Sequence, residues 1–335
     1  MSAPGLDAAT GSGGDRDTLP SLDRPLSRGL CLILAGFYAT LLALLPVYEF
    51  QDRINYRNYA EDSANIFAAL WSLSPAAALF NEPIWLLINS VLGAVFPADT
   101  VIRIIVFTGA FGVSYPVFRH SGKYWPYAFI FLTFPSVIKN HIIHLRQGLA
   151  LGIFLPFYFM GWPRARWAGT AIAAFVHSSM FLVGAIMLFD WLLRRMRLAI
   201  DVRALGYFAA GLIFAFGLGF LATTLGARQA EAYEFASSSG SGVAFVFWAI
   251  IAVLYASAPR AFTRQNSLAI AAMLFYLATY FFLEVTARIF ESMLTIVLLS
   301  SLQLPSKRRL FFLASFSVFS VSLWLNRLGQ PALGF

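Results

Sequence analysis

The chain has 335 residues, of which 59% are hydrophobic and only 12% are charged, and its formal net charge is +8. Soluble domains carry about 25% charged residues, so this composition, with a mean hydropathy of +0.72, excludes an ordinary soluble protein and predicts an all-α polytopic membrane protein. The basic residues cluster in short segments between apolar runs, where they orient helices rather than bind nucleic acid, and a single cysteine excludes a disulfide framework.

The N-terminal residues 1–28 are rich in Gly, Ser and Asp and contain no apolar core, which predicts a disordered tail. The first apolar run, 29–47, is long enough to span a bilayer, and no small-residue cleavage site follows it, so we do not expect a signal peptide. Residues 29–335 are therefore expected to form a single transmembrane domain.

Apolar runs that cross, or nearly cross, a bilayer follow one another along the chain. They predict about 9–12 transmembrane helices. The runs are 29–47, 83–96, 101–118, 125–137, 148–160, 167–193, 205–225, 242–256, 267–283, 289–302 and 310–325.

Arginines predict the orientation, because cytoplasmic loops are enriched in Lys and Arg. Arg24 and Arg28 precede the first run, which places the N-terminus in the cytoplasm and the segments 49–81 and 226–241 outside. The first part of 49–81 is polar, and a weakly amphipathic stretch that follows is expected to lie on the membrane surface.

The run 167–193 has cytoplasmic signals on both sides: Arg164 and Arg166 before it, and a triple-arginine segment at 194–197 after it. Both flanks face the cytoplasm only if the run is a broken hairpin that turns near His177, with arms of about 15–22 Å. The enrichment of Lys and Arg in cytoplasmic loops also predicts that 119–123 is cytoplasmic. If every apolar run before it crosses the membrane, however, this segment is outside.

Arg146 and His177 are ionisable residues in apolar surroundings, where a charge costs a few kcal/mol and normally faces a cavity or a partner. Arg146 follows His141 and His144 and precedes Gln147. A guanidinium there suits bidentate phosphate binding, and the alternative is an interfacial anchor that reaches lipid headgroups. A zinc site is not favoured, because no third ligand is spaced with the two histidines.

His177-Ser178-Ser179 has two interpretations: a general base or donor to a sugar hydroxyl, or a packed histidine with serines at a helix interface. A Ser-His hydrolase is not favoured, because adjacent residues do not form the nucleophile–base geometry. Asn81-Glu82-Pro83 opens the next apolar run, so Glu82 is either a helix cap or a carboxylate facing the same compartment as Arg146. Glu284 and Arg288 are spaced as an i,i+4 ion pair, which is either a minor salt bridge or a second cationic site.

Over roughly residues 52–193 these features resemble the EpsG-like exopolysaccharide polymerases, relatives of the Wzy-type O-antigen polymerases. The resemblance rests on an aromatic-acidic outer segment, a Glu-Pro that opens a helix, an Arg-Gln that begins a long apolar helix, and a Phe-x-His-Ser about thirty residues later. The matching positions are Tyr56, Tyr59, Asp62, Glu82, Pro83, Arg146, Gln147, Phe175, His177 and Ser178.

This resemblance implies a glycosyltransferase with GT-C-like architecture that joins polyprenyl-pyrophosphate-linked repeat units into a surface or exo-polysaccharide at the outer face of the bacterial inner membrane. Arg146, with Arg288, would neutralise the leaving pyrophosphate, and His177 or Glu82 would accept the proton of the attacking hydroxyl. Gln147, His144, Ser178, Asp62, Tyr56 and Tyr59 are the further expected substrate-binding residues.

The expected partners are the lipid-linked glycan donor and acceptor, the bilayer, and a chain-length regulator or flippase. No tight acidic pair is present, so we expect no metal and no cofactor. Two other functions stay open from the residues alone: a glycolipid flippase or transporter, and a membrane O-acyltransferase with an intramembrane histidine as base.

Overall fold

The computed structural model describes residues 26–50, 52–225, 242–282 and 285–334, and every regular element in this part of the chain is a helix. Residues 1–25 of the predicted tail 1–28, the outer segment 226–241 and Glu284 lie outside the described residues, and Arg28 begins the first helix. The α-helices are α1 (Arg28–Ala43), α2 (Arg53–Leu73), α3 (Pro75–Phe80), α4 (Pro83–Gly93), α5 (Ala98–Ser121), α6 (Trp125–Thr133), α7 (Pro135–Ile142), α8 (Leu145–Phe159), α9 (Pro163–Val176), α10 (Ser179–Arg195), α11 (Ile200–Leu225), α13 (Val243–Ala256), α14 (Arg260–Gln265), α15 (Ser267–Thr279), α16 (Val285–Ser301) and α17 (Ser306–Arg327), with short 3-10 turns at Gly122–Tyr124 and Pro331–Gly334.

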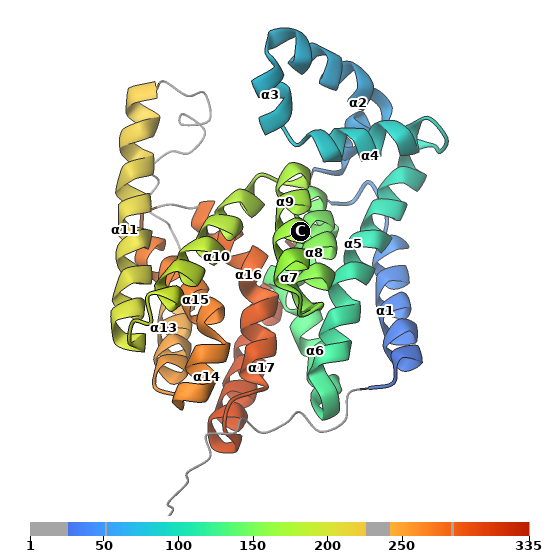
Figure 1. The fold of residues 1–335 in the computed structure, drawn as a ribbon. Helices are drawn as coiled ribbons and strands as arrows, with labels where there is room; N and C mark the ends of the chain where they lie inside the picture. Colours follow the sequence, from blue (N-terminus) through green and yellow to red (C-terminus); the bar gives the residue numbers. More distant parts are fainter. Residues whose placement is uncertain (1–25, 51, 226–241, 283–284, 335) are drawn as a thin grey trace, which may run out of the picture.

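Helices stand side by side in a bundle, and α2, α3 and α4 lie together at its upper end in Figure 1. The opposite, lower end gathers segments that are far apart in the sequence. Arg119 at the end of α5 donates to the carbonyl of Leu26 before α1 (2.8 Å), and the His120 ring stacks on Phe159 at the end of α8 (4.4 Å between centroids). At the same end, Asn266 before α15 donates to Gln303 after α16 (2.9 Å).

The hairpin expected around His177 is present. α9 runs from the lower end to His177, and α10 returns from Ser179 to the lower end (Figure 1). His177 has an extended backbone (φ −150°, ψ 125°), which stops α9 after Val176. The arginines that flank the hairpin are therefore at the same end of the molecule.

The parity conflict at 119–123 also has a structural explanation. The run 83–96 forms α4, a helix of 11 residues that is about 16 Å long and packs on α2 at the upper end. Because α4 does not run along the bundle, α5 descends directly after it and brings Arg119 and Lys123 to the lower end with Arg28. The segment 49–81 is itself mostly helical, and α2 buries one face through Arg53, Tyr56, Ala60 and Ser63.

Several helices are able to span a membrane. Within the described residues, three helical stretches are long and apolar enough, Ala98–Thr133, Ile200–Gly217 and Ser306–Arg327, and the pair α7–α8, bent by 109°, makes up to four. Four further apolar helices are shorter: α1, α4, α13 and α15. This supports an all-α membrane protein, while the count of 9–12 spans stays a prediction.

The outer flanks of the bundle expose large apolar side chains, as expected where a helix faces lipid. They are carried by α1, α11 and α17, the helices at the sides of the bundle. Examples are Ile33, Phe37, Ile213, Phe216, Val318 and Val321. Inside, α5 and α8 approach very closely at Gly112 and Gly152, where a side chain on either glycine would collide with the other helix backbone.

Candidate functional site

Glu82 lies at the junction of α3 and α4, in a conformation that non-glycine residues rarely adopt. Its φ of 58° and ψ of 54° are left-handed, which costs of order 1–3 kcal/mol and persists only where the surroundings impose it. Pro83 begins α4, and the Glu82 side chain makes no capping hydrogen bond to that helix. Glu82 therefore occupies the N-cap position of α4, but its carboxylate does not cap that helix and is directed to other partners.

The Glu82 carboxylate joins three groups from two distant segments. Arg146 Nη1 donates to Oε2 (2.6 Å), while His177 Nδ1 (2.7 Å) and the Ser178 backbone N–H (3.1 Å) both contact Oε1. The Glu82 side chain is 10% exposed, against 36% for Arg146 and 20% for His177. The structure thus brings together the three residues that the sequence predicted as catalytic. We call Glu82, Arg146 and His177 the central cluster.

The central cluster keeps Glu82 ionised. Burial opposes the charge on this carboxyl, but the hydrogen bond from His177 and the charges of His177 and Arg146 outweigh it, so its pKa is lowered to about 2. A carboxylate only accepts hydrogen bonds, so the Nδ1 atom of His177 must carry the proton that they share. In the neutral ring, Nε2 then has its lone pair free, and no described residue bonds to it.

Arg146 owes its position to the sharp bend between α7 and α8. The bend ends the first helix at Ile142 and starts the second at Leu145, so Arg146 lies in the first turn of α8. Its guanidinium lies over the Tyr59 ring of α2 (5.6 Å). Glu82 uses one terminal nitrogen and Tyr56 also forms a hydrogen bond with this side chain, which stays 36% exposed.

The two tyrosines of α2 near the central cluster differ in exposure. Both contact Trp85 edge-on, Tyr56 at 5.6 Å and Tyr59 at 6.0 Å between centroids. Tyr56 is only 5% exposed, so its ring packs in the core and does not present a face for a sugar. Tyr59 is half-buried and retains some open surface beside Arg146.

Gln147 is buried and fixes α8 to α16. It is 1% exposed, and its amide nitrogen donates to the Arg288 carbonyl (2.8 Å) and to Ser292 Oγ (2.9 Å). This side chain therefore positions Arg288 rather than facing a ligand. Arg288 itself is exposed, and no described carboxylate pairs with it; Glu284, the partner expected from its i,i+4 spacing, lies outside the described residues.

A second ion pair, which the sequence analysis missed in part, lies further inside. Lys139 of α7 contacts Glu291 of α16 at 2.6 Å, and Glu291 is 6% exposed. The signal for Lys139 was the same as for Arg146, a lone cation within apolar residues. The adjacent His141 is 2% exposed, and neither of its ring nitrogens has a partner, so it is a packed core residue.

The remaining predicted residues lie around or away from the central cluster. His144 precedes α8 and is half-buried, close enough to sense the charges of Lys139, Arg288, His177 and Arg146. Ser178 is exposed and contributes its backbone N–H to Glu82. Asp62 is exposed on α2, and its contact is with Asn65 one turn further on (2.5 Å), so the structure does not bring it to the other site residues.

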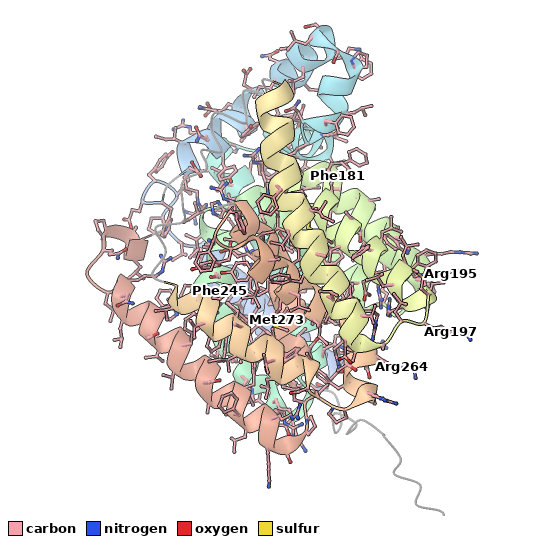
Figure 2. All side chains as sticks on the ribbon, turned by 90° about the vertical axis from the view of Figure 1, so that its left-hand side faces the viewer. Phe181, Arg195, Arg197, Phe245, Arg264 and Met273 are labelled. Carbon is pink, nitrogen blue, oxygen red and sulfur yellow. The ribbon has the colours of Figure 1, made fainter. Side chains whose placement is uncertain are left out.

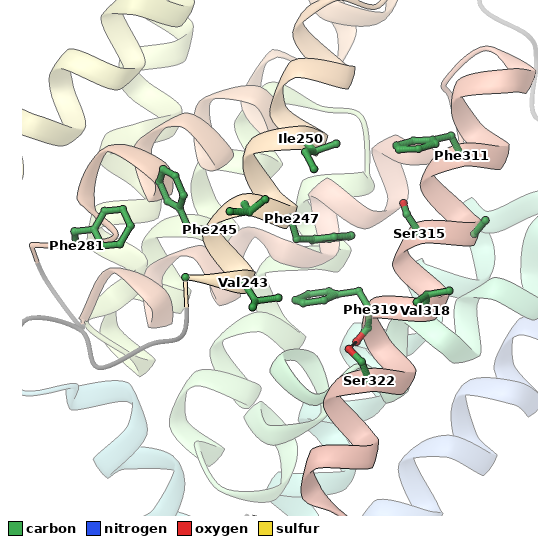
Figure 3. Close-up of a pocket in the computed structure, with 13 residues that line it drawn as sticks. Val243, Phe245, Phe247, Ile250, Phe281, Phe311, Ser315, Val318, Phe319 and Ser322 are labelled. Atoms are coloured by element: carbon green, nitrogen blue, oxygen red, sulfur yellow. Dashed lines mark hydrogen bonds between the residues drawn. The ribbon is translucent and has the colours of Figure 1, made fainter.

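An apolar groove lies apart from the central cluster. It lies between α13 and α17, holds about 830 Å³, and has Phe281 at one edge (Figure 3). Phe247 and Phe319 stack across it at 4.1 Å, and Ser315 and Ser322 are the polar lining residues. A groove without ionisable side chains suits contact with lipid and offers nothing for acid–base chemistry.

In comparisons with known proteins, the chain matches no protein-family model, no curated protein and no solved structure. The function therefore has to be inferred from the residues of the site themselves.

Proposed function

We propose that the protein is a membrane-embedded glycosyltransferase that polymerises polyprenyl-pyrophosphate-linked sugar units at the upper end of the bundle. The observation that carries the proposal is the central cluster: an imidazole held by a carboxylate, directly beside an arginine. A general base and a fixed cation are the two groups needed to transfer a sugar from a pyrophosphate leaving group to a hydroxyl.

In the proposed reaction His177 is the base and Glu82 positions it. Nε2 of His177 accepts the proton of the acceptor hydroxyl as that oxygen attacks the anomeric carbon of the donor sugar. The bond from this carbon to the pyrophosphate oxygen breaks, and the polyprenyl pyrophosphate leaves with the electron pair. Glu82 is a poor base at neutral pH because its pKa is about 2, so its part is to hold the Nδ1 proton and to stabilise the imidazolium that forms.

Arginines would stabilise the leaving group. Arg146 has donor nitrogens beyond the one bound to Glu82, and Arg288 lies on the neighbouring helix α16 without a described carboxylate partner. A guanidinium binds phosphate oxygens through two parallel hydrogen bonds. In a site that excludes water, such preorganised charge is more effective than in solution.

The charge distribution favours an outward-facing upper end. Basic residues of the described chain concentrate at the lower end: Arg28, Arg119, Lys123, Arg164, Arg166, Arg194, Arg195, Arg197, Arg203, Arg260, Arg264, Lys307, Arg308 and Arg309. Under the positive-inside rule, this distribution supports a cytoplasmic lower end and N-terminus, and a central cluster on the outer side of a bacterial inner membrane.

The broken helices keep a second function under consideration. Half-helices that end at ionisable residues, as at His144 and His177, are also typical of transporters. A flippase would move the lipid-linked sugar across the bilayer without lengthening it, and an O-acyltransferase would attach an acyl group to it. The product formed in proteoliposomes separates the three activities.

His177→Gln tests the proposal. With lipid-linked repeat units in proteoliposomes, we expect chain extension to fall by about 10²–10⁴-fold, because the general base is lost. The matched control is His120→Gln, which replaces a histidine stacked on Phe159 at the lower end and should leave extension unchanged. Full extension by a folded His177→Gln protein would rule out the assigned base. Translocated or acylated product without extension would replace the proposed function.

A further inference from the structure

The lower end of the bundle contains a second polar cavity, far from the central cluster. It holds about 690 Å³ and lies between the α10–α11 turn and α14. Figure 2 shows Arg197 and Arg264, two of its lining residues, on this end of the molecule. Five arginines line the cavity, and we call it the basic cavity: Arg194, Arg197, Arg203, Arg260 and Arg264.

The arginines of the basic cavity are not balanced by carboxylates. Arg194 is paired with Asp190 (3.1 Å), whose other oxygen accepts from the Tyr207 hydroxyl (2.7 Å). Asp201 is the acidic residue among the lining residues. No described carboxylate forms an ion pair with the other four arginines, so the cavity has an excess of positive charge.

Arg203 distinguishes this cavity from a cluster of arginines that only orients helices in the membrane. Orientation in a membrane requires only that arginines be present near helix ends, where they stay solvated. Arg203 instead is 4% exposed, its buried Nε has no hydrogen-bond partner, and no described group bonds to its guanidinium. Burying an unpaired charge costs several kcal/mol, so a partner is expected where this side chain borders the cavity.

The backbone at the start of α11 also favours an anion in the basic cavity. Ala199 and Ile200 line the cavity at the start of α11, a helix of 26 residues. The amides of a first helical turn have no partner within the helix, and the helix dipole favours an anion beside them. Guanidinium groups together with such a helix start form a typical phosphate site.

We propose that the basic cavity binds a phosphate-bearing anion on the side of the membrane opposite the central cluster. The anion is either a free phosphate compound or the headgroup of an anionic lipid, since both present the same oxygens to the arginines. The proposal is independent of the glycosyltransferase proposal, because no residue is shared between the two sites.

The experiment uses the full chain in two arms. In the first, detergent-purified protein is titrated with radiolabelled inorganic pyrophosphate at constant ionic strength. In the second, the protein is placed in nanodiscs of phosphatidylcholine with or without phosphatidylglycerol, and its thermal unfolding is measured. Each arm compares the unchanged protein with Arg203→Gln and, because Arg203 is buried and its variant is at risk of misfolding, with the exposed Arg260→Gln.

The control is Lys307→Gln/Arg308→Gln, which removes charge from the same end outside the cavity. We expect saturable binding or stabilisation in one arm, weakened about tenfold or more by either cavity variant and little by the control. Pyrophosphate binding identifies a soluble ligand, and an effect of phosphatidylglycerol identifies a lipid. The proposal is overturned if neither arm responds, or if the control variant loses the response as fully as Arg260→Gln does.

Discussion

A carboxylate that accepts hydrogen bonds from a guanidinium, an imidazole and a backbone amide has little capacity left for a further ligand. Glu82 is in this position, buried and held in a left-handed conformation. Its contacts fix the ring of His177 and the first turn of α8 at the same time. At the residue scale, Glu82 therefore acts through its neighbours.

The pH dependence of stability tests this role of Glu82. Its pKa is lowered from the usual 4.5 to about 2, so ionised Glu82 stabilises the folded state fully above about pH 5, and this contribution is lost as the pH falls toward 2. We expect Glu82→Gln to lower the thermal midpoint at pH 7, and the difference from the unchanged protein to shrink steadily between about pH 5 and 2. Unfolding in detergent at several pH values measures this.

The exposed Glu61 provides the control for that measurement. It pairs with Arg57 on the surface of α2, and its side chain is 52% exposed, so Glu61→Gln should have little effect at any pH. A Glu82→Gln difference that stays constant down to pH 2 would show that the ionised carboxylate does not stabilise the fold.

Arg146→Lys tests whether the proposed polymerisation needs the geometry of the Arg146 guanidinium or only its charge. One guanidinium nitrogen of Arg146 is committed to Glu82, and the side chain is 36% exposed. An ammonium is a point charge that cannot reproduce the planar guanidinium fork, so we expect Arg146→Lys to reduce glycan chain length nearly as much as Arg146→Ala. Arg57→Lys on the exposed face of α2 is the matched control. Polymer of nearly full length from the lysine variant would mean that the charge alone is required.

At the scale of elements, the decisive features are the breaks in the helices. The break at His177 divides an apolar run into α9 and α10, and the bend at 143–144 separates α7 from α8. Each break exposes backbone groups that only a polar environment satisfies, and Glu82 supplies one partner by accepting from the Ser178 amide. Because these two breaks lie close together, His177 and Arg146 both contact the carboxylate of Glu82.

Cysteine labelling tests the arrangement of α9 and α10. In a Cys31→Ser background, a cysteine at Ala165 and one at Met196 should react from the same side of the membrane, and one at the exposed Ser178 from the other. The native Cys31 is fully buried, so its replacement should not alter the topology. Ala165→Cys that reacts from the outer side together with Ser178→Cys would rule out the hairpin in the membrane.

At the scale of the whole molecule, two charged regions lie at opposite ends of the bundle: the central cluster at the upper end and the basic cavity at the lower end. The upper region contains carboxylates that are already engaged: Glu82 with Arg146 and His177, and Glu291 with Lys139. Among the described residues, no three groups of His, Cys, Asp and Glu are arranged to hold a metal ion. The proposed function assigns stabilisation of the leaving pyrophosphate to the arginines.

Removal of divalent metal ions by chelation tests whether the proposed reaction depends on a metal. Because the carboxylates of the site are bound to cationic side chains, we expect polymerisation by the purified protein to be unchanged in excess EDTA. The control is an equal concentration of EDTA preloaded with magnesium, which has the same ionic strength. Loss of activity on chelation, restored by magnesium or manganese, would make the acidic residues ligands and reduce Arg146 to a supporting part.

Much of the architecture follows from local sequence. Long apolar runs form helices, and prolines at 83, 126, 135 and 163 mark where helices begin. The arginines on both sides of 167–193 require a hairpin, and the chain folds that way. The position of α4 could not be predicted from the sequence. An apolar run as short as 83–96 is compatible with crossing the bundle and with lying across its end.

The sequence by itself determined the helical fold class, the hairpin at His177, and Glu82, Arg146 and His177 as candidate residues, because apolar periodicity and charges in apolar surroundings are local properties. Only the tertiary structure decided that these three side chains share hydrogen bonds, that Tyr56 and Gln147 are buried, and that Arg203 is unpaired in the basic cavity. Such pairings connect residues that are 64 and 95 positions apart. They depend on how the broken helices pack, and no local pattern encodes that packing.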